Sequence, residues 1–239
     1  MKLFLSGYGK MGKMVEALAL EKGWEIVGHG DIDCPENYQS APKADICIDF
    51  SGVGALPRLA DYIRRTKTPL LSGTTGLTEP DFSVLRELSR EVPVIWAANY
   101  STGIAVLRKI LRDYAAVLSD WDKEILEIHH NQKADAPSGT AKILLAELDP
   151  ASQALAVHGR EGLCGKRKAE EIGVFALRGG TVAGEHQVHF FGEDETLVLT
   201  HRAASRRIFA AGAVRAAEAL AACAPGYYNL DELIFKDGR

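Results

Sequence analysis

The sequence lacks paired cysteines and long apolar runs. No two cysteines form a CxxC pair; the four are scattered, at Cys34, Cys47, Cys164 and Cys223. This pattern argues against a disulfide framework and against a zinc site. The apolar stretch at the start ends at Ser6-Gly7, too early for a signal peptide or a membrane span. We therefore expect a cytoplasmic protein with no bound metal.

The sequence also lacks a strong charge of either sign. The formal net charge is −4 and the pI is about 6.0, so neither a nucleic acid nor a membrane is expected as a partner. Of the 239 residues, 46% are hydrophobic and 25% are charged. Such a composition is typical of soluble globular proteins with one large domain or two small ones.

The first residues, KLFLSGYGKMGKMVEALALEKG, predict a strand, a glycine turn and an amphipathic helix. Gly7, Gly9 and Gly12 form a GxGxxG motif in that context, which is typical of a dinucleotide site. A second strand from Glu25 ends near Asp31, and 31 − 12 places this acid 19 residues beyond Gly12. A ribose-binding carboxylate is expected at about 20 residues. For Gly12, close helix–strand packing alone is an alternative explanation.

The alternation of strands and helices continues to about residue 101. Strands are expected at 44–50, 69–71 and 92–97, and helices at 55–66 and 79–91. This alternation predicts a parallel, doubly wound sheet, which binds ligands at the carboxyl ends of its strands. Three turns fall at such ends: Ser51-Gly52, the SGTTG turn at 72–76 and the turn at 98–101. The GTTG turn offers hydroxyls to a nicotinamide, although an ordinary tight loop explains it equally well.

After residue 101 the pattern changes. A helix is expected over 102–118, followed by strands at 121–130, 174–177, 186–191 and 196–201, with one helix at 138–148. These elements predict an α+β domain with an open mixed or mainly antiparallel sheet. An alanine-rich helix at 207–223 is expected to pack back on the first half.

The predicted fold is thus α/β, with a Rossmann-like parallel sheet domain followed by an α+β domain with an open mixed sheet. The first, dinucleotide-binding domain comprises 1–101 and 207–239. The second, substrate-binding domain comprises 102–206.

The most polar stretch is EIHHNQKADAPSGTA, which starts at Glu127. Ser138 suits a helix N-cap, and the N–H groups that follow it form an anion site. Lys133 can pair with a carboxylate, and a histidine can transfer a proton near neutral pH. His129 and His130 point to opposite faces if the strand is regular. A purely structural histidine is the alternative. Together with a dinucleotide site, the stretch predicts hydride transfer to a small anion.

This stretch closely resembles the E-x-H-H-x-x-K-x-D-A-P-S-G-T-A signature of the 4-hydroxy-tetrahydrodipicolinate reductase family, also called dihydrodipicolinate reductases. The resemblance extends through GYGKMG, GTTG, AANYS, RGGTVAGEH and HRAASRRIFAAGAVRAA, and so covers nearly the whole chain. It implies NAD(P)H-dependent reduction of a cyclic dicarboxylate with loss of water, in diaminopimelate and lysine biosynthesis. It also implies a homotetramer assembled through the sheet of the second domain.

The resemblance implies a role for each matching residue. His129 and Lys133 correspond to the proton-transferring residues. Positions that match substrate contacts are His130, Ser138, Gly139, Thr140 and Thr75. Positions that match cofactor contacts are Gly7, Tyr8, Gly9, Lys10, Met11, Gly12, Asp31, Gly73, Thr74, Thr75, Ala97, Ala98, Asn99 and Tyr100.

The residues after the second strand predict a preference for NADH. Asp31 is followed by Ile32 and Asp33, without the arginine that often receives the 2′-phosphate of NADPH. Two carboxylates repel that phosphate, and Lys10 offsets part of the repulsion. We expect NADH to be preferred and NADPH to be accepted.

Two alternative functions remain at this stage. Another amino-acid or imine dehydrogenase, such as one acting on aspartate, would need the cofactor half but not this His-His-x-x-Lys with Ser-Gly-Thr. A dinucleotide-sensing regulator without turnover would not be expected to keep a proton donor and a dicarboxylate site together.

Overall fold

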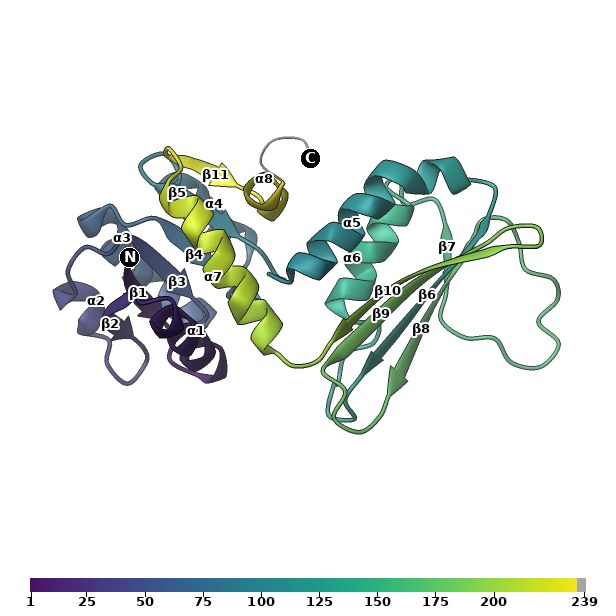
Figure 1. Ribbon diagram of the computed structural model, residues 1–239, viewed down its shortest axis with the longest axis horizontal. Helices are drawn as coiled ribbons and strands as arrows, with labels where there is room; N and C mark the ends of the chain where they lie inside the picture. Colours follow the sequence, from purple (N-terminus) through teal and green to yellow (C-terminus); the bar gives the residue numbers. More distant parts are fainter. Residues whose placement is uncertain (236–239) are drawn as a thin grey trace. The chain divides into compact units, whose positions relative to one another are not determined.

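The computed structural model describes residues 1–235, which form two compact units (Figure 1). The first unit joins Met1–Thr102 to the chain from Arg207 onward, and the second comprises Gly103–Arg206. The chain therefore leaves the first unit after α5 begins and returns to it at the start of α7, where α5 is Thr102–Tyr114 and α7 is Arg207–Ala221. No helix within residues 1–235 is long and apolar enough to cross a membrane.

The first unit is built on a parallel sheet. Within residues 1–235 it has six strands in the order β11-β5-β4-β3-β1-β2. Their bounds are β1 (Lys2–Ser6), β2 (Glu25–Gly30), β3 (Ile46–Asp49), β4 (Leu70–Ser72), β5 (Pro93–Trp96) and β11 (Gly226–Tyr228). All the pairings are parallel, which confirms the predicted Rossmann-like sheet. The strand order reverses between β1 and β3, the place where open α/β sheets bind ligands.

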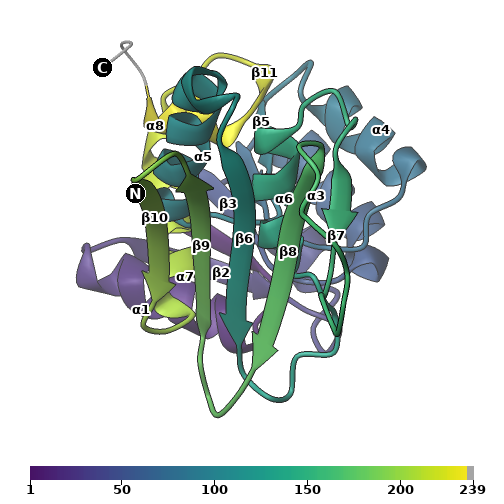
Figure 2. The same ribbon diagram turned by 90° about the vertical axis from the view of Figure 1, so that its right-hand side faces the viewer.

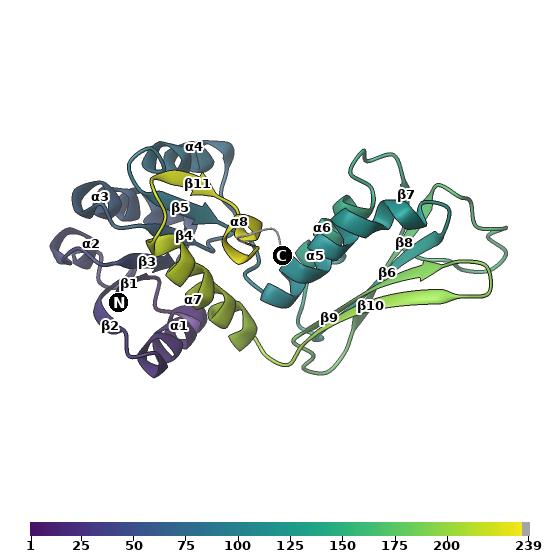
Figure 3. The same cartoon turned by 45° about the horizontal axis from the view of Figure 1, so that its top comes forward.

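Helices cover both faces of this sheet (Figures 1 and 3). Helix α7 packs on α1 and on the central strands, and α3 packs with α2 and α4 on the opposite face. The bounds are α1 (Lys10–Glu21), α2 (Asn37–Ser40), η1 (Val53–Ala55), α3 (Leu56–Thr66), α4 (Glu79–Leu88) and α8 (Leu230–Ile234). Helix α3 ends where Lys67 adopts a left-handed conformation with φ of 55°. The expected return of the alanine-rich helix to the first half is confirmed.

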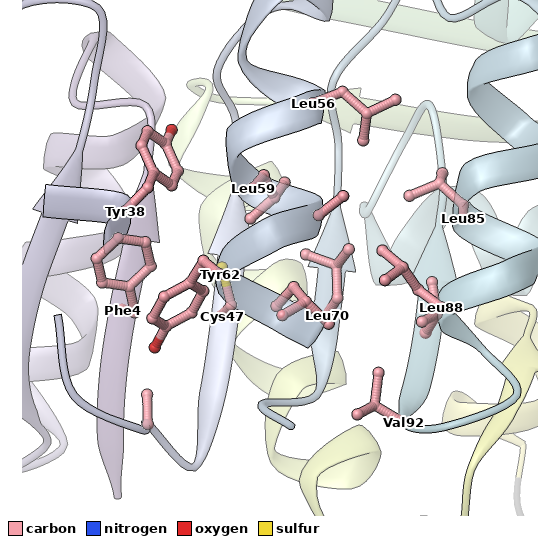
Figure 4. Close-up of a cluster of buried hydrophobic side chains, with 14 of the residues drawn as sticks. Phe4, Tyr38, Cys47, Leu56, Leu59, Tyr62, Leu70, Leu85, Leu88 and Val92 are labelled. Carbon is pink, nitrogen blue, oxygen red and sulfur yellow. The ribbon is translucent and has the colours of Figure 1, made fainter. Parts of the chain in front are cut away.

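The core beneath α3 follows from strand register (Figure 4). Phe4, Cys47 and Leu70 align across adjacent strands, so their side chains share one face of the sheet. Phe4 stacks on Tyr62 of α3 with ring centroids 4.2 Å apart, and Leu59 is fully buried beside them. Each buried side chain of this size stabilises the fold by roughly 1.5–3 kcal/mol. This core holds β1, β3 and β4 against α3 and so fixes the positions of the carboxyl ends of these strands.

The second unit has a mixed sheet (Figure 2). Within the described chain its five strands run in the order β10-β9-β6-β8-β7. Their bounds are β6 (Asp122–His129), β7 (Leu155–Val157), β8 (Glu171–Arg178), β9 (Gly184–Phe191) and β10 (Thr196–Ala203). β6–β8 and β7–β8 are parallel, whereas β6–β9 and β9–β10 are antiparallel. The predicted open mixed sheet is confirmed.

One face of the second sheet is covered by helices, because alternate residues of its strands are apolar. Helices α5, η2 (Ala115–Leu118) and α6 (Gly139–Leu148) lie on that face (Figures 2 and 3). Ile125, Val188 and Phe190 are at most 1% exposed there and pack with Leu144 of α6. The structure also has short strands at 155–157 and 226–228 that were not predicted. Three residues are too few to display a period of two.

Gly212 permits close packing of α7 on the rest of the first unit. A Cβ atom at this position would lie 1.7 Å from the carbonyl oxygen of Tyr100. We expect Gly212→Ala to lower the free energy of unfolding by about 1–3 kcal/mol, because overpacking outweighs the gain in helix propensity of about 1 kcal/mol. Urea denaturation of Gly212→Ala and Gly54→Ala measures the difference, since a Cβ at Gly54 would meet nothing within 4 Å. Equal stability of the two variants would contradict this packing argument.

Candidate active site

The glycine turn after β1 requires residues without a side chain. Gly7 has a φ of 87°, and a Cβ there would lie 2.6 Å from the Cα of Ser51. A Cβ on Gly12 would lie 2.1 Å from the carbonyl oxygen of Gly7. Gly9 has open space around its Cβ position and caps α1 without a side-chain hydrogen bond. The first N–H groups of α1 have no intrahelical acceptor, so this turn fits a pyrophosphate.

Asp31 lies beside the glycine turn, as its spacing predicts. Its Oδ2 accepts a hydrogen bond of 2.5 Å from the main-chain N–H of Tyr8, and its Oδ1 accepts one of 2.6 Å from the N–H of Ile32. The carboxylate is thereby oriented and still has lone pairs for ribose hydroxyls. The side chain of Ile32 is 83% exposed, and Lys10 is exposed at the start of α1. The structure thus brings Tyr8, Lys10 and Asp31 to one end of the sheet.

The turns after β4 and β5 lie at the same carboxyl-terminal edge of the sheet. A Cβ on Gly73 would lie 2.2 Å from Cε1 of Phe50, so the turn passes close to that ring. The Tyr100 hydroxyl donates to the carbonyl of Ser72 at 2.7 Å, and the N–H of Ala97 donates to the same oxygen at 3.1 Å. These bonds tie the two turns together. The side chain of Tyr100 is buried, so it supports the turns rather than facing solvent.

In the second unit, the end of β6 carries a fully buried carboxylate, that of Glu127. Arg178 of β8 donates to it twice, from Nη1 at 2.9 Å and from Nη2 at 2.7 Å. Burial alone would raise the pKa of Glu127, but the hydrogen bonds from Arg178, His129 and Ser138 hold it below its usual value. Glu127 is therefore ionised and can only accept hydrogen bonds.

This carboxylate determines the tautomer of His129. The Nδ1 atom of His129 lies 2.5 Å from Glu127 Oε2 and must carry the proton, because an ionised carboxylate cannot donate. The Nε2 atom is then the one available for proton transfer. A Cβ on Gly184 would lie 3.1 Å from Nε2, so glycine leaves room at this position. His129 is an oriented imidazole at the last residue of β6.

The loop after β6 carries Lys133. Its Nζ lies 2.7 Å from Asp135 Oδ1, and this pairing lowers the pKa of Asp135. The guanidinium of Arg178 also donates to the carbonyl of Asp135 at 2.7 Å, which anchors the loop to the buried ion pair. His130 follows the last residue of β6 and is half-buried. Lys133 thus lies in the loop that follows His129, and Arg178 bonds both to this loop and to Glu127.

The loop ends at the start of α6. Ser138 is the N-cap: its Oγ accepts from the N–H of Ala141 at 3.2 Å, and its own N–H donates to Glu127 at 3.0 Å. Ser138 Oγ also lies 3.0 Å from Nε2 of His186. Gly139 is exposed, and a Cβ there would meet nothing within 4 Å. The start of α6 is therefore open at Gly139, and the first N–H groups of a helix can receive an anion.

Sequence reasoning missed three residues of this cluster: Glu127, Arg178 and His186. Each belongs to a stretch that carries the family resemblance, but their pairing depends on strand register. His186 is 4% exposed, and burial lowers its pKa to about 4, with His129 adding to the effect. Its Nδ1 is buried and has no hydrogen-bond partner within residues 1–235. Across the same residues, no group of three or more His, Cys, Asp and Glu side chains is arranged to hold a metal.

Known proteins resemble this chain along its whole length. Residues 1–100 match the family model "Dihydrodipicolinate reductase, N-terminus" and residues 103–234 match "Dihydrodipicolinate reductase, C-terminus". The 4-hydroxy-tetrahydrodipicolinate reductase of Staphylococcus aureus is 42% identical over 242 residues, covering 98% of this chain and 100% of the relative. That of Exiguobacterium sibiricum is 38% identical over 243 residues, covering 98% and 96%.

A solved structure shows the same fold. The dipicolinate-bound dihydrodipicolinate reductase of Paenisporosarcina sp. TG-14 superposes with a TM-score of 0.76 at 21% identity, over 96% of this chain and 97% of that one. Fold and sequence together define a two-unit α/β oxidoreductase that uses a nicotinamide dinucleotide. The chain belongs to the dihydrodipicolinate reductase family, which confirms the family expected from its motifs.

Buried His186 predicts a pH-dependent stability. Between its ordinary pKa of 6.5 and its folded pKa of about 4, the unfolded chain binds a proton at His186 and the folded chain does not. Lowering the pH through this window therefore favours unfolding, by up to about 3 kcal/mol, since one pKa unit is worth about 1.4 kcal/mol. Urea unfolding of wild type and His186→Gln at several pH values measures this effect. The free energy of unfolding of the variant should depend less steeply on pH than that of wild type. The same pH dependence in both proteins would refute the role of His186.

Proposed function

We propose that this protein reduces 4-hydroxy-tetrahydrodipicolinate to tetrahydrodipicolinate with loss of water, in diaminopimelate and lysine biosynthesis. The observation that carries the proposal is the cluster at the end of β6, where an oriented histidine and the start of α6 are bonded to the carboxylate of one buried ion pair. The loop that carries Lys133 is bonded to the same ion pair through Arg178. A bound NAD(P)H supplies the hydride. The two alternative functions, an aspartate-type dehydrogenase and a non-catalytic dinucleotide sensor, would not be expected to keep this cluster.

The residues of the second unit take distinct roles in this proposal. The start of α6, at Gly139 and Thr140, receives one carboxylate of the substrate, and Lys133 pairs with the other in place of Asp135. His129 transfers a proton at Nε2, because Glu127 holds the proton on Nδ1. Lys133 is the second proton-transferring group. His130 and Ser138 contact the substrate region, Ser138 mainly by holding the helix start in place.

The first unit binds the dinucleotide in this proposal. The pyrophosphate lies on the glycine turn and the start of α1, from Gly7 to Gly12, and Asp31 accepts hydrogen bonds from the ribose hydroxyls. The remaining contacts are assigned to the turns after β4 and β5, at Gly73, Thr74, Thr75, Ala97, Ala98, Asn99 and Tyr100, with Thr75 also assigned to substrate. The preference for NADH over NADPH follows from the carboxylates of Asp31 and Asp33.

We also propose that the protein is a cytoplasmic homotetramer that associates through the second sheet. Phe191 and Val198 are 41% and 42% exposed and alternate with residues that face the helices. They therefore lie on the face of the sheet away from α5 and α6. Apolar side chains on an uncovered sheet face are typical of an association surface.

Replacement of the proton-transferring histidine tests the function. The assay contains pyruvate, aspartate semialdehyde and the synthase of the preceding pathway step, which makes the substrate from them. Turnover is followed as the decay of NADH absorbance. Wild type should turn over, and His129→Gln should lower kcat by about 10²–10⁴-fold because general acid–base catalysis is lost. NADH binding, measured by fluorescence titration, should be unchanged.

The neighbouring histidine provides the control. His130→Gln should raise KM for the substrate more than it lowers kcat, since His130 is assigned to substrate contact alone. Absence of turnover by wild type with either cofactor would refute the reductase function. Loss of NADH binding in His129→Gln would show a structural histidine instead.

The cofactor preference is testable at Ile32, which is exposed next to Asp31. Wild type should have a higher kcat/KM with NADH than with NADPH. Ile32→Arg should raise kcat/KM for NADPH by about tenfold, because a guanidinium pairs with the 2′-phosphate and offsets the two carboxylates. Ile32→Gln is the control of similar length without charge and should leave the ratio nearly unchanged. A wild type with tenfold higher kcat/KM for NADPH would contradict the assignment.

A further inference from the structure

One buried carboxylate lies beneath the turns of the first unit and collects hydroxyl groups from several segments. Asp49 is the last residue of β3 and is 2% exposed. Its Oδ1 accepts from Ser6 Oγ at 2.7 Å, from Ser51 Oγ at 2.5 Å and from the Ser51 N–H at 3.2 Å. Its Oδ2 accepts from Ser72 Oγ at 2.7 Å and from Thr74 Oγ1 at 2.8 Å.

These donors belong to three different turns at the carboxyl ends of the strands. Ser6 ends β1 and precedes Gly7, and Ser51 lies against that glycine. Ser72 and Thr74 flank Gly73 in the turn after β4. β1 and β3 are also the strands between which the strand order reverses. The carboxylate therefore lies under the place where a parallel sheet binds its ligand.

No basic side chain within residues 1–235 forms an ion pair with Asp49. A buried carboxylate is costly unless hydrogen bonds satisfy it, so this one depends on the hydroxyl groups around it. Bonds to a charged acceptor are about twice as strong as neutral ones. Each hydroxyl that bonds to Asp49 fixes the turn that carries it, because serine and threonine side chains are short.

We infer that Asp49 is a positioning residue for the dinucleotide. It does not touch the cofactor; it holds the turns after β1, β3 and β4 in the arrangement that receives the cofactor. The inference rests on the proposed NAD(P)H use of the first unit. Preorganised turns bind the cofactor more tightly, because less conformational entropy is lost when the cofactor binds.

The test replaces Asp49 with asparagine in the full-length protein. The amide has nearly the same shape, but its NH2 group is a donor and meets hydroxyl donors where a carboxylate oxygen accepted two bonds. We expect the dissociation constant for NADH, from fluorescence titration, to rise by about tenfold or more. In steady-state assays the KM for NADH should rise similarly, with kcat at saturating NADH within about threefold of wild type.

A matched control lies at the opposite ends of the same strands. Thr68 is fully buried before β4, and its Oγ1 bonds to Ala44 and Thr66. Thr68→Val also removes a buried hydroxyl network and should lower stability, but should leave NADH binding within about twofold of wild type. The NADH dissociation constant of each variant is compared with its free energy of unfolding, measured by urea denaturation. A loss of NADH binding in Asp49→Asn larger than in Thr68→Val at a similar loss of stability separates positioning from a general loss of stability.

A milder variant covers the case in which Asp49→Asn does not fold. Ser6→Ala removes one bond to Oδ1 from a fully buried residue outside the proposed cofactor contacts. It should raise the NADH dissociation constant by about threefold. NADH binding equal to that of wild type in the folded variants would overturn the positioning role. Failure of wild type to bind NADH or NADPH would instead overturn the proposed function, and the inference with it.

Discussion

A fully buried carboxylate, that of Glu127, bonds the imidazole of His129, the guanidinium of Arg178 and the main-chain N–H of Ser138. These groups come from the end of β6, the end of β8 and the start of α6. Breaking a buried ion pair by removing one partner typically costs about 3–5 kcal/mol, because the remaining charge is left uncompensated. The strand end, the loop and the helix start therefore share one fixed arrangement, on which the chemistry of the second unit depends.

The two units satisfy a buried carboxylate in different ways. Glu127 has a guanidinium partner and a histidine, so its neighbourhood carries charge and can exchange a proton. Asp49 has only hydroxyl and N–H donors within residues 1–235, so its neighbourhood is rigid but has no titrating partner. This difference matches the proposed roles: proton transfer in the second unit, and cofactor placement in the first.

Much of this arrangement was predictable from the sequence. The hydrophobic periodicity and the turn and cap residues were enough to predict the parallel sheet, the mixed sheet and the helix start at Ser138. These features act between residues that are close in sequence. The partners of the buried carboxylates were not predictable in that way. Arg178 lies 51 positions from Glu127, and His186 lies 48 positions from Ser138. Such pairs depend on strand register, which the sheet as a whole sets.

Ser138 illustrates how the structure refines a motif. Its hydroxyl bonds to Ala141 and His186 and its N–H bonds to Glu127, so its polar atoms are already engaged within the protein. Under the proposed function, the substrate carboxylate must then be received mainly by the N–H groups that follow, and a glycine at 139 keeps the approach open. Lys133 is paired with the carboxylate of Asp135. When a second carboxylate of the substrate takes the place of Asp135, Lys133 keeps an anionic partner. The site therefore favours a dicarboxylate over a substrate with a single acid group.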